Sequence, residues 1–213
     1  MIEQTIMQVL WASKLLSNLE KVRGWKHWNA ILDRTYAFYY RARRQTPSAV
    51  VRKKLAPASG IIIIICRGNV CRSAFLANYL RTIVYPQDRF TFLSAGLRTR
   101  DGSLAPPDAL LCAADYGIDL TSHRGKAITV MDVQEAALVV GMEPIHHIEF
   151  FLRYFKWRRK FLLLRALEDR PLSVTVPDPF EKGPETFQDC FRILVENGNA
   201  LMIALQAFGE RHV

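Results

Sequence analysis

The residues best suited to chemistry in this chain lie in one short stretch, CRGNVCRS, at residues 66–73. Cys66 can attack an electrophile once its thiol ionises, and Arg72 presents a planar fork of N–H donors that matches phosphate oxygens. Gly68 and Asn69 are residue types that tolerate left-handed backbone conformations, which turn successive N–H groups toward one point. A ring of such donors binds an anion and favours the thiolate form of a cysteine at its start. The stretch therefore predicts a phosphate-binding loop around a nucleophilic Cys66.

The elements on either side of this loop must position it. Five consecutive isoleucines at 61–65 precede it, and a run so short and β-branched predicts a strand buried on both faces. A helical pattern follows at about 72–84. In a parallel sheet, ligands bind where the carboxyl end of a strand meets the next helix, whose N-terminus also attracts anions. The loop residues that we expect to surround the phosphate are Arg67, Gly68, Asn69, Val70, Cys71 and Ser73.

After residue 59 the chain alternates short apolar runs with helical patterns. Further strands are expected at 90–94, 137–140 and 161–164, and further helices at 104–116, 143–156 and 184–207. This alternation predicts an α/β fold with an open four-stranded parallel sheet, doubly wound, so that helices cover both faces. We assign residues 59–213 to this domain.

Residues 1–58 predict a basic, helical N-terminal extension. They hold 11 Lys/Arg against 3 Asp/Glu, a net charge of +8, whereas residues 59–213 hold 18 against 17, a net of +1. Apolar residues recur at helical spacing over about 6–22 and again over about 28–44, and residues 50–60 predict a linker. The apolar side of the first helix needs a partner, which is the catalytic domain, a second copy or an anionic membrane surface. We expect the extension to support a homodimer, and we rank membrane contact below it because acidic residues interrupt the basic ones.

Composition restricts the class and the compartment of the protein. No run approaches the roughly 20 apolar residues that a membrane-spanning helix needs, and the N-terminus lacks the features of a signal peptide. Four cysteines are too few for a disulfide framework, so we expect a cytoplasmic protein. The basic extension carries no recognisable nucleic-acid-binding motif, and we expect no nucleic-acid partner.

The loop and four later segments together resemble the low-molecular-weight protein tyrosine phosphatases, whose signature is a hydrophobic strand followed by C-x-G-N-x-C-R-S. After this signature the family usually has proline, and this chain has Ala74. The later segments that match are Ser94-Ala95-Gly96, Gly117-Ile118-Asp119 with Ser122-His123-Arg124, Met142-Glu143, and Asp178-Pro179-Phe180. Animal members have a second aromatic residue next, whereas Glu181-Lys182 here resembles bacterial members.

The resemblance implies roles for residues outside the loop. Asp178 is the expected general acid, which protonates the leaving oxygen and then activates water. Phe180 is expected to form one wall of the substrate cleft by stacking on a phenyl ring. Ser94 and His123 are expected to join the polar side chains of the loop in a hydrogen-bond network that fixes it.

The implied function is a protein tyrosine phosphatase that works through a phosphocysteine intermediate, with Cys66, Arg72 and Asp178 as catalytic residues and no metal or cofactor. Its expected partner is a phosphotyrosine protein, with a bacterial tyrosine kinase as one candidate. Cys71 can form a reversible disulfide with Cys66 that shields the nucleophile from further oxidation. Two alternatives stay open: a catalytically idle phosphate- or phosphopeptide-binding module, and an arsenate reductase of the same fold. The second is weakened because residues 139–151 lack the redox cysteines that such an enzyme needs.

Overall fold

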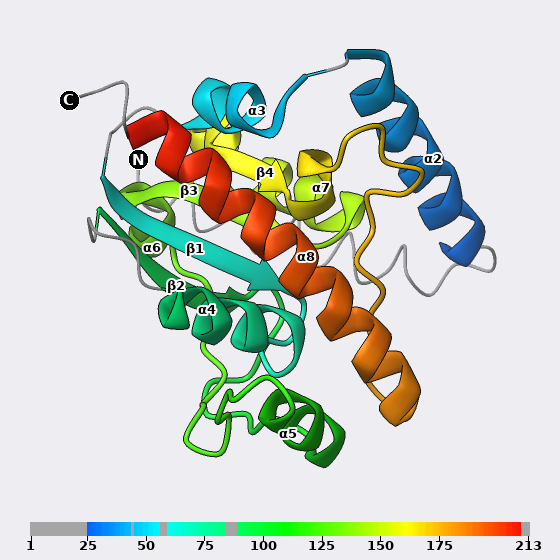
Figure 1. The fold of residues 1–213 in the computed structure, drawn as a ribbon, viewed down its shortest axis with the longest axis vertical. Helices are drawn as coiled ribbons and strands as arrows, with labels where there is room; N and C mark the ends of the chain where they lie inside the picture. The colour runs from blue at the N-terminus through cyan, green and yellow to red at the C-terminus, as the bar shows by residue number, and fades with distance from the viewer. Residues whose placement is uncertain (1–24, 44, 56–58, 84–88, 210–213) are drawn as a thin grey trace.

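The computed structural model describes residues 25–43, 45–55, 59–83 and 89–209. At its centre lies a sheet of four parallel strands in the order β2-β1-β3-β4 (Figure 1). The strands are β1 (Gly60–Cys66), β2 (Phe90–Gly96), β3 (Ala136–Gly141) and β4 (Phe161–Leu163). Each strand begins and ends within two residues of the range expected from sequence, so the predicted four-stranded parallel sheet is confirmed.

Helices cover both faces of this sheet, which confirms the doubly wound arrangement (Figure 1). On one face, α4 (Arg72–Thr82) and the long α8 (Pro184–Gly209) pack against each other. On the other, α6 (Val130–Glu135) and α7 (Pro144–Arg153) pack against β3. The remaining elements are α2 (Trp25–Arg43), α3 (Pro47–Lys54), α5 (Pro107–Ala114) and two 3₁₀ helices, η1 (Phe155–Lys160) and η2 (Leu164–Leu167).

The strand β1 lies in the middle of the core, between β2 and β3. Its residues Ile62–Ile65 are almost completely buried, and each such side chain contributes about 1.5–3 kcal/mol relative to an exposed one. The chain adds β2 on one side of β1 and β3 on the other, and ligands bind at such a reversal of strand order. Cys66, the last residue of β1, therefore lies at the end of a buried strand and at the edge of the sheet where ligands bind.

The N-terminal extension differs from its prediction in one respect. The predicted helix at 28–44 corresponds to α2, whereas the predicted helix at 6–22 lies outside the described residues. The prediction of a linker at 50–60 is wrong over residues 50–54, which belong to α3. Thr46 caps this helix, since its side chain accepts a hydrogen bond from the Ala49 N–H at 3.3 Å, and Pro47 occupies the first turn. Three side chains from this region are buried in the main core: Val50, Val51 and Leu55.

Several helix boundaries also differ from those predicted. The pattern at 104–116 forms only the shorter α5, whose start is set by Pro106 and Pro107. The pattern at 143–156 ends as α7 at Arg153, and the separate η1 follows. The elements α6 and η2 were not predicted because they are too short to show a periodicity. Within the described residues, no helix is long and apolar enough to cross a membrane.

Candidate active site

Cys66 carries the sulfur at the centre of the site, and the residue is only 3% exposed. The backbone N–H of Asn69 lies 3.3 Å from its Sγ, and the hydroxyl oxygen of Ser73 lies 3.0 Å from it. Ser73 belongs to the first turn of α4, so the helix holds its hydroxyl in place. Two hydrogen-bond donors thus converge on the sulfur from the loop and from the helix, an arrangement that stabilises a thiolate.

Asn69 holds the loop together. It is completely buried, and its φ of 52° lies in the left-handed region. Its Nδ2 donates to Ser73 Oγ at 3.0 Å, so the Ser73 hydroxyl proton has two acceptors in reach, of which Cys66 Sγ at 3.0 Å is nearer than the Ala95 carbonyl oxygen at 3.5 Å. Its Oδ1 accepts from the Lys126 N–H at 2.9 Å, and its carbonyl accepts from His123 Nε2 at 2.7 Å. These bonds tie the loop to the chain segment around residues 123–126.

The residues expected behind the loop are only partly brought to it. His123 reaches the loop, as expected, and the contact requires a proton on its Nε2. Ser94 does not: it pairs with Ile64 in the β1–β2 ladder, and its hydroxyl forms no hydrogen bond with any described loop residue. The nearest part of that segment is the Ala95 carbonyl oxygen, 3.5 Å from Ser73 Oγ.

Glycines shape the loop differently from the sequence-based expectation. Asn69 adopts the left-handed conformation, whereas Gly68 has no positive φ. Gly96 has a clearer role, because a Cβ there would lie 3.0 Å from the Arg67 carbonyl oxygen and 2.8 Å from Thr99 Cβ. Glycine at the end of β2 therefore lets the neighbouring segment approach the back of the loop closely.

The guanidinium of Arg72 has three polar partners. It is 1% exposed, and its Nη1 donates to Glu143 Oε1 and, at 3.0 Å, to the Val176 carbonyl. Its Nη2 lies 2.8 Å from Asp178 Oδ2. Burial alone would lower the pKa of Arg72, but the negative groups around it, Glu143 first, outweigh burial and raise that pKa. The guanidinium is therefore a permanent cation fixed between two carboxylates.

Glu143 is the site residue that sequence reasoning did not assign. It lies two residues after the end of the buried β3 and forms a salt bridge with Arg72. Burial pushes the pKa of Glu143 upward, but the attraction of Arg72 holds it below its ordinary value. Burial lowers the pKa of the adjacent His146 to about 4, so this histidine is neutral near pH 7. The sequence does contain a signal for Glu143, because Met142-Glu143 matches a segment of the family. The match alone assigns no role to the carboxylate.

The segment that carries Asp178 closes the site from the far end of the chain. The Asp178 side chain is 35% exposed, and its Oδ1 accepts a hydrogen bond from the Phe180 N–H at 3.4 Å. Phe180 itself is 44% exposed. Glu181 adopts a φ of 60°, and Lys182 Nζ donates to the Asp178 carbonyl at 2.7 Å, so the turn after Asp178 is well defined.

This geometry agrees with a comparison against known protein families. Residues 61–210 match the model of the low molecular weight phosphotyrosine protein phosphatases, a span that begins in β1 and ends after α8. The chain belongs to this family. Its class of reaction is accordingly the hydrolysis of phosphoric monoesters.

Curated relatives of the chain include bacterial phosphatases of this family. A probable low molecular weight protein-tyrosine-phosphatase, EpsP of Ralstonia solanacearum, is 26% identical over 148 residues, which are 70% of this chain and 97% of the relative. The phosphatase Wzb of Escherichia coli K12 is 29% identical over 68% of this chain and 95% of its own length. The phosphatase Ptp of Acinetobacter johnsonii is 37% identical over 60% of this chain and 85% of its own length.

Solved structures show the same family fold. Wzb of Escherichia coli K30, in complex with sulphate, superposes with a TM-score of 0.61 at 26% identity, over 68% of this chain and 99% of that one. The YwlE arginine phosphatase of Geobacillus stearothermophilus superposes with a TM-score of 0.67 at 24% identity, over 72% of this chain and 97% of that one. At this identity the second match supports the fold alone.

The remaining loop residues of this family member lie as follows. Arg67 is exposed, Val70 is partly buried, and Ala74, at the family's usual proline position, is buried in the first turn of α4. Cys71 is a free, buried cysteine, and burial raises the pKa of its thiol. Across the described ranges, no three His, Cys, Asp or Glu side chains gather in a way that could hold a metal ion.

Proposed function

We propose that this protein hydrolyses phosphotyrosine in proteins through a phosphocysteine intermediate. One arrangement carries the proposal: Cys66 Sγ lies among hydrogen-bond donors while Arg72, at the other end of the same loop, contacts Asp178. The loop thereby supplies a nucleophile and an anion-binding guanidinium, and the segment that carries Asp178 adds a carboxyl group beside them. A second observation supports it, because Arg72 Nε is buried and has no hydrogen-bond partner among the described residues. Buried N–H donors are almost always paired, and a phosphoryl oxygen is a matching acceptor.

The first step transfers the phosphoryl group to the enzyme. The Cys66 thiolate attacks phosphorus while the bond between phosphorus and the tyrosine oxygen breaks. The loop N–H groups and Arg72 bind the phosphoryl oxygens, on which negative charge is concentrated in the transition state. Asp178, in its protonated form, gives its proton to the leaving phenolate, which departs as neutral tyrosine.

The second step regenerates the enzyme. Water attacks phosphorus, the Asp178 carboxylate takes the proton from that water, and the bond between phosphorus and sulfur breaks. The electron pair returns to Cys66 as a thiolate, and inorganic phosphate is released. Ser73 Oγ, 3.0 Å from Sγ, donates a hydrogen bond that stabilises the departing thiolate. The same contact serves both steps, because the sulfur begins and ends the cycle as an anion.

A phenyl ring is the leaving group that suits the exposed parts of the site. Phe180 offers an exposed aromatic face two residues after Asp178, against which a tyrosine ring can stack. EpsP and Wzb carry names of protein-tyrosine-phosphatases, and we extend that activity to this chain. The proposed partner is a phosphotyrosine protein, with a bacterial tyrosine kinase as the first candidate. We place the reaction in the reducing cytoplasm, where the four free, buried cysteines would stay reduced.

The two rival functions receive less support. An arsenate reductase needs a relay of reactive cysteines, whereas burial raises the pKa of both Cys71 and Cys190, the latter to about 12. An idle binding module would not need a carboxyl group beside the bound phosphate, and Asp178 is in contact with Arg72. YwlE, a structural neighbour, is named an arginine phosphatase. Because that match supports only the fold, it does not favour this activity, but phosphoarginine is included among the substrates to be assayed.

Turnover of p-nitrophenyl phosphate by the wild type and by Cys66→Ser tests the proposal. We expect the wild type to turn over without added metal and Cys66→Ser to be inactive while still binding orthovanadate or phosphate in titration calorimetry, because Arg72 and the loop N–H groups remain. Cys112→Ser is the matched control, since Cys112 is a buried cysteine of α5 outside the loop, and it should stay active. Full turnover by Cys66→Ser would overturn the nucleophile assignment. Preferred hydrolysis of phosphoarginine over phosphotyrosine, or reduction of arsenate, would redirect the function.

A further inference from the structure

Asp33, in helix α2 of the extension, contacts the segment that leads to Asp178. Its Oδ1 accepts three hydrogen bonds: from Ser173 Oγ at 3.2 Å, from the Val174 N–H at 2.9 Å and from Thr175 Oγ1 at 2.8 Å. These donors lie three to five residues before Asp178, and about 140 residues after Asp33. Figure 1 shows α2 lying alongside this segment, which is the gold coil that leads into α8. Asp33 also lies outside residues 61–210, the part that matches the family.

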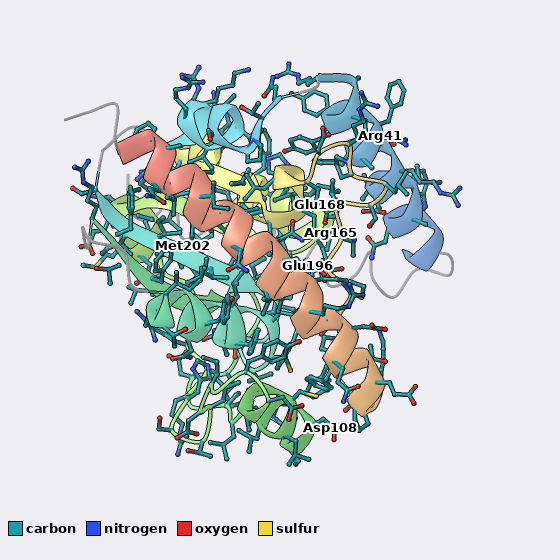
Figure 2. All side chains as sticks on the ribbon, in the orientation of Figure 1. Arg41, Asp108, Arg165, Glu168, Glu196 and Met202 are labelled. Carbon is teal, nitrogen blue, oxygen red and sulfur yellow. The ribbon has the colours of Figure 1, made fainter. Side chains whose placement is uncertain are left out.

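The same segment is held from the other side by the catalytic domain. Arg165, whose guanidinium also pairs with Glu168 (Figure 2), donates from Nη1 to the Thr175 carbonyl at 2.9 Å. The Val176 N–H donates to the Met142 carbonyl at 2.8 Å. The Val176 carbonyl in turn accepts from Arg72 Nη1 at 3.0 Å. The residues before Asp178 are therefore fixed by a carboxylate from the extension on one side and by the active-site framework on the other.

The contact between α2 and this segment depends on hydrogen bonds rather than on close packing. A cavity of about 280 Å³ lies between them, and its lining includes Asn29, Asp33, Glu143, Thr175 and Pro177. Residues 173–178 form no helix or strand; the side chains of Val174 and Val176 are buried in the core, and those of Ser173 and Thr175 donate to Asp33. Without Asp33, Ser173 and Thr175 would lose this partner and regain conformational freedom. A carboxylate with three donors is thus the main restraint on this side of the segment.

The helix that carries Asp33 is itself firmly placed. Ala37, one turn further along α2, is completely buried. The Tyr36 hydroxyl lies 3.0 Å from His147 Nδ1 in α7, and its ring packs edge-on against that imidazole. His147 in turn stacks on Phe161 of β4, with ring centroids 4.8 Å apart. Asp33 therefore connects the segment to an anchor that rests on the sheet.

We propose that Asp33 is a positioning residue for the general acid: the extension clamps residues 173–177 so that Asp178 faces Arg72 and the leaving oxygen. The inference rests on the proposed function, in which Asp178 gives its proton to that oxygen. It assigns a catalytic purpose to the N-terminal extension, which a role in stability alone would not require. Loss of the clamp lets Asp178 leave its place while the phosphate-binding loop, held by Asn69, stays intact.

The test compares Asp33→Ala and Thr175→Val with Thr35→Ala in the full-length chain. Thr35→Ala is the matched control, because it removes an exposed side-chain hydrogen bond within α2, to the Ile31 carbonyl, and none to the segment or to the anchor. Each variant is assayed on phenyl phosphate, whose leaving group needs a proton, and on p-nitrophenyl phosphate, whose more acidic leaving group needs it less. We expect Asp33→Ala to lower kcat for phenyl phosphate about tenfold, as the loss of charge-assisted hydrogen bonds implies, with a smaller loss for p-nitrophenyl phosphate. Thr175→Val should shift the ratio of the two rates in the same direction, and Thr35→Ala should leave that ratio unchanged.

A double variant separates positioning from folding. In the Asp178→Asn background there is no acid to position, so adding Asp33→Ala should leave the ratio of the two rates unchanged. An equal loss on both substrates, an unchanged ratio in both Asp33→Ala and Thr175→Val, or a shift of the ratio that persists in the Asp178→Asn background would each overturn the proposal. Activity of Cys66→Ser would instead show that the proposed function itself fails. The two failures are thus distinguishable.

Discussion

Arg72 Nη2 lies 2.8 Å from Asp178 Oδ2, so the guanidinium expected to bind phosphate already holds the carboxyl group expected to donate the proton. A phosphoryl group in the loop presents negative oxygens to the same guanidinium and competes with Asp178 for it. Its binding therefore weakens the hold of Arg72 on Asp178 and leaves that carboxyl group free to turn toward the leaving oxygen. Substrate binding and preparation of the acid are coupled through one side chain.

Asp178→Asn should slow the turnover of aryl phosphates by about a hundredfold or more, the usual cost of losing a general acid. The loss should shrink along a series of phosphate esters as the leaving phenol becomes more acidic. Steady-state kinetics on four or five substituted phenyl phosphates measure this dependence. If the loss is the same for every phenol, Asp178 only shapes its turn.

Glu143→Gln should destabilise the free enzyme more than the phosphate-bound enzyme. The substitution removes the charged partner of the buried Arg72 and keeps a hydrogen-bond acceptor, so we expect the free energy of unfolding to fall by about 1–3 kcal/mol. Bound phosphate supplies a new anion, so the stabilisation by phosphate should be larger in Glu143→Gln than in the wild type. Urea unfolding with and without phosphate measures both quantities. Glu196→Gln, which removes the same charge from an exposed pair with Arg192, is the control and should change neither.

Acid should destabilise the protein through two histidines of α7. Burial lowers the pKa of His146 and of His147 to about 4, against an ordinary value of 6.5. Because the unfolded chain binds these protons at higher pH than the folded one, the stability is fully present above about pH 6.5 and is lost as the pH falls toward 4. Each histidine adds a slope of up to about 1.4 kcal/mol per pH unit within that window. Melting temperatures between pH 7.5 and 4.5 test this, and His147→Phe should flatten the curve; an unchanged curve would contradict the assignment.

The homodimer expected from the extension remains a prediction, and α2 offers a direct test. Trp28, Ile31 and Phe38 are exposed on this helix. If the extension pairs two copies through this surface, light scattering should give a mass of twice 24.4 kDa for the wild type. The triple variant Trp28→Gln, Ile31→Gln, Phe38→Gln should have a mass close to 24.4 kDa. Leu111→Gln and Leu172→Gln change exposed apolar residues elsewhere and should not alter the mass. A wild-type protein that is monomeric at every concentration sinks the dimer, and loss of liposome binding in the triple variant would favour the membrane alternative.

The parts of the site that follow from local sequence were predictable, and those that depend on distant contacts were not. The strand, the loop and the following helix are continuous, so the neighbours of Cys66 could be placed by pattern alone. By contrast, the partners of Arg72 lie 71 and 104 residues away, at Glu143 and the Val176 carbonyl. Hydrophobic periodicity carries no information about which carboxylate meets a given arginine. Even Ser94, correctly placed in a strand, does not reach the network, because the exact facing of a side chain depends on the packing of the whole sheet.

The same dependence on packing explains why the linker predicted at residues 50–60 is wrong over residues 50–54. Thr46-Pro47-Ser48 marks the end of one helix, and the basic residues that follow suggest a solvated linker. In the structure these residues begin α3, because threonine before proline also starts helices, and the two valines among the basic residues face the core. Turn signals and helix-start signals use the same amino acids, and only the packing decides between them.

The burial of α3 has a practical consequence for anyone who expresses this protein in pieces. The family match begins at residue 61, yet Val50, Val51 and Leu55 fill part of the core against α8, η2 and β4. A fragment trimmed to the family boundary would present that apolar surface to water and should come out of cells insoluble. Such insolubility would not indicate that the active site is defective. The shortest fragment worth cloning starts no later than Thr46, the residue that caps α3.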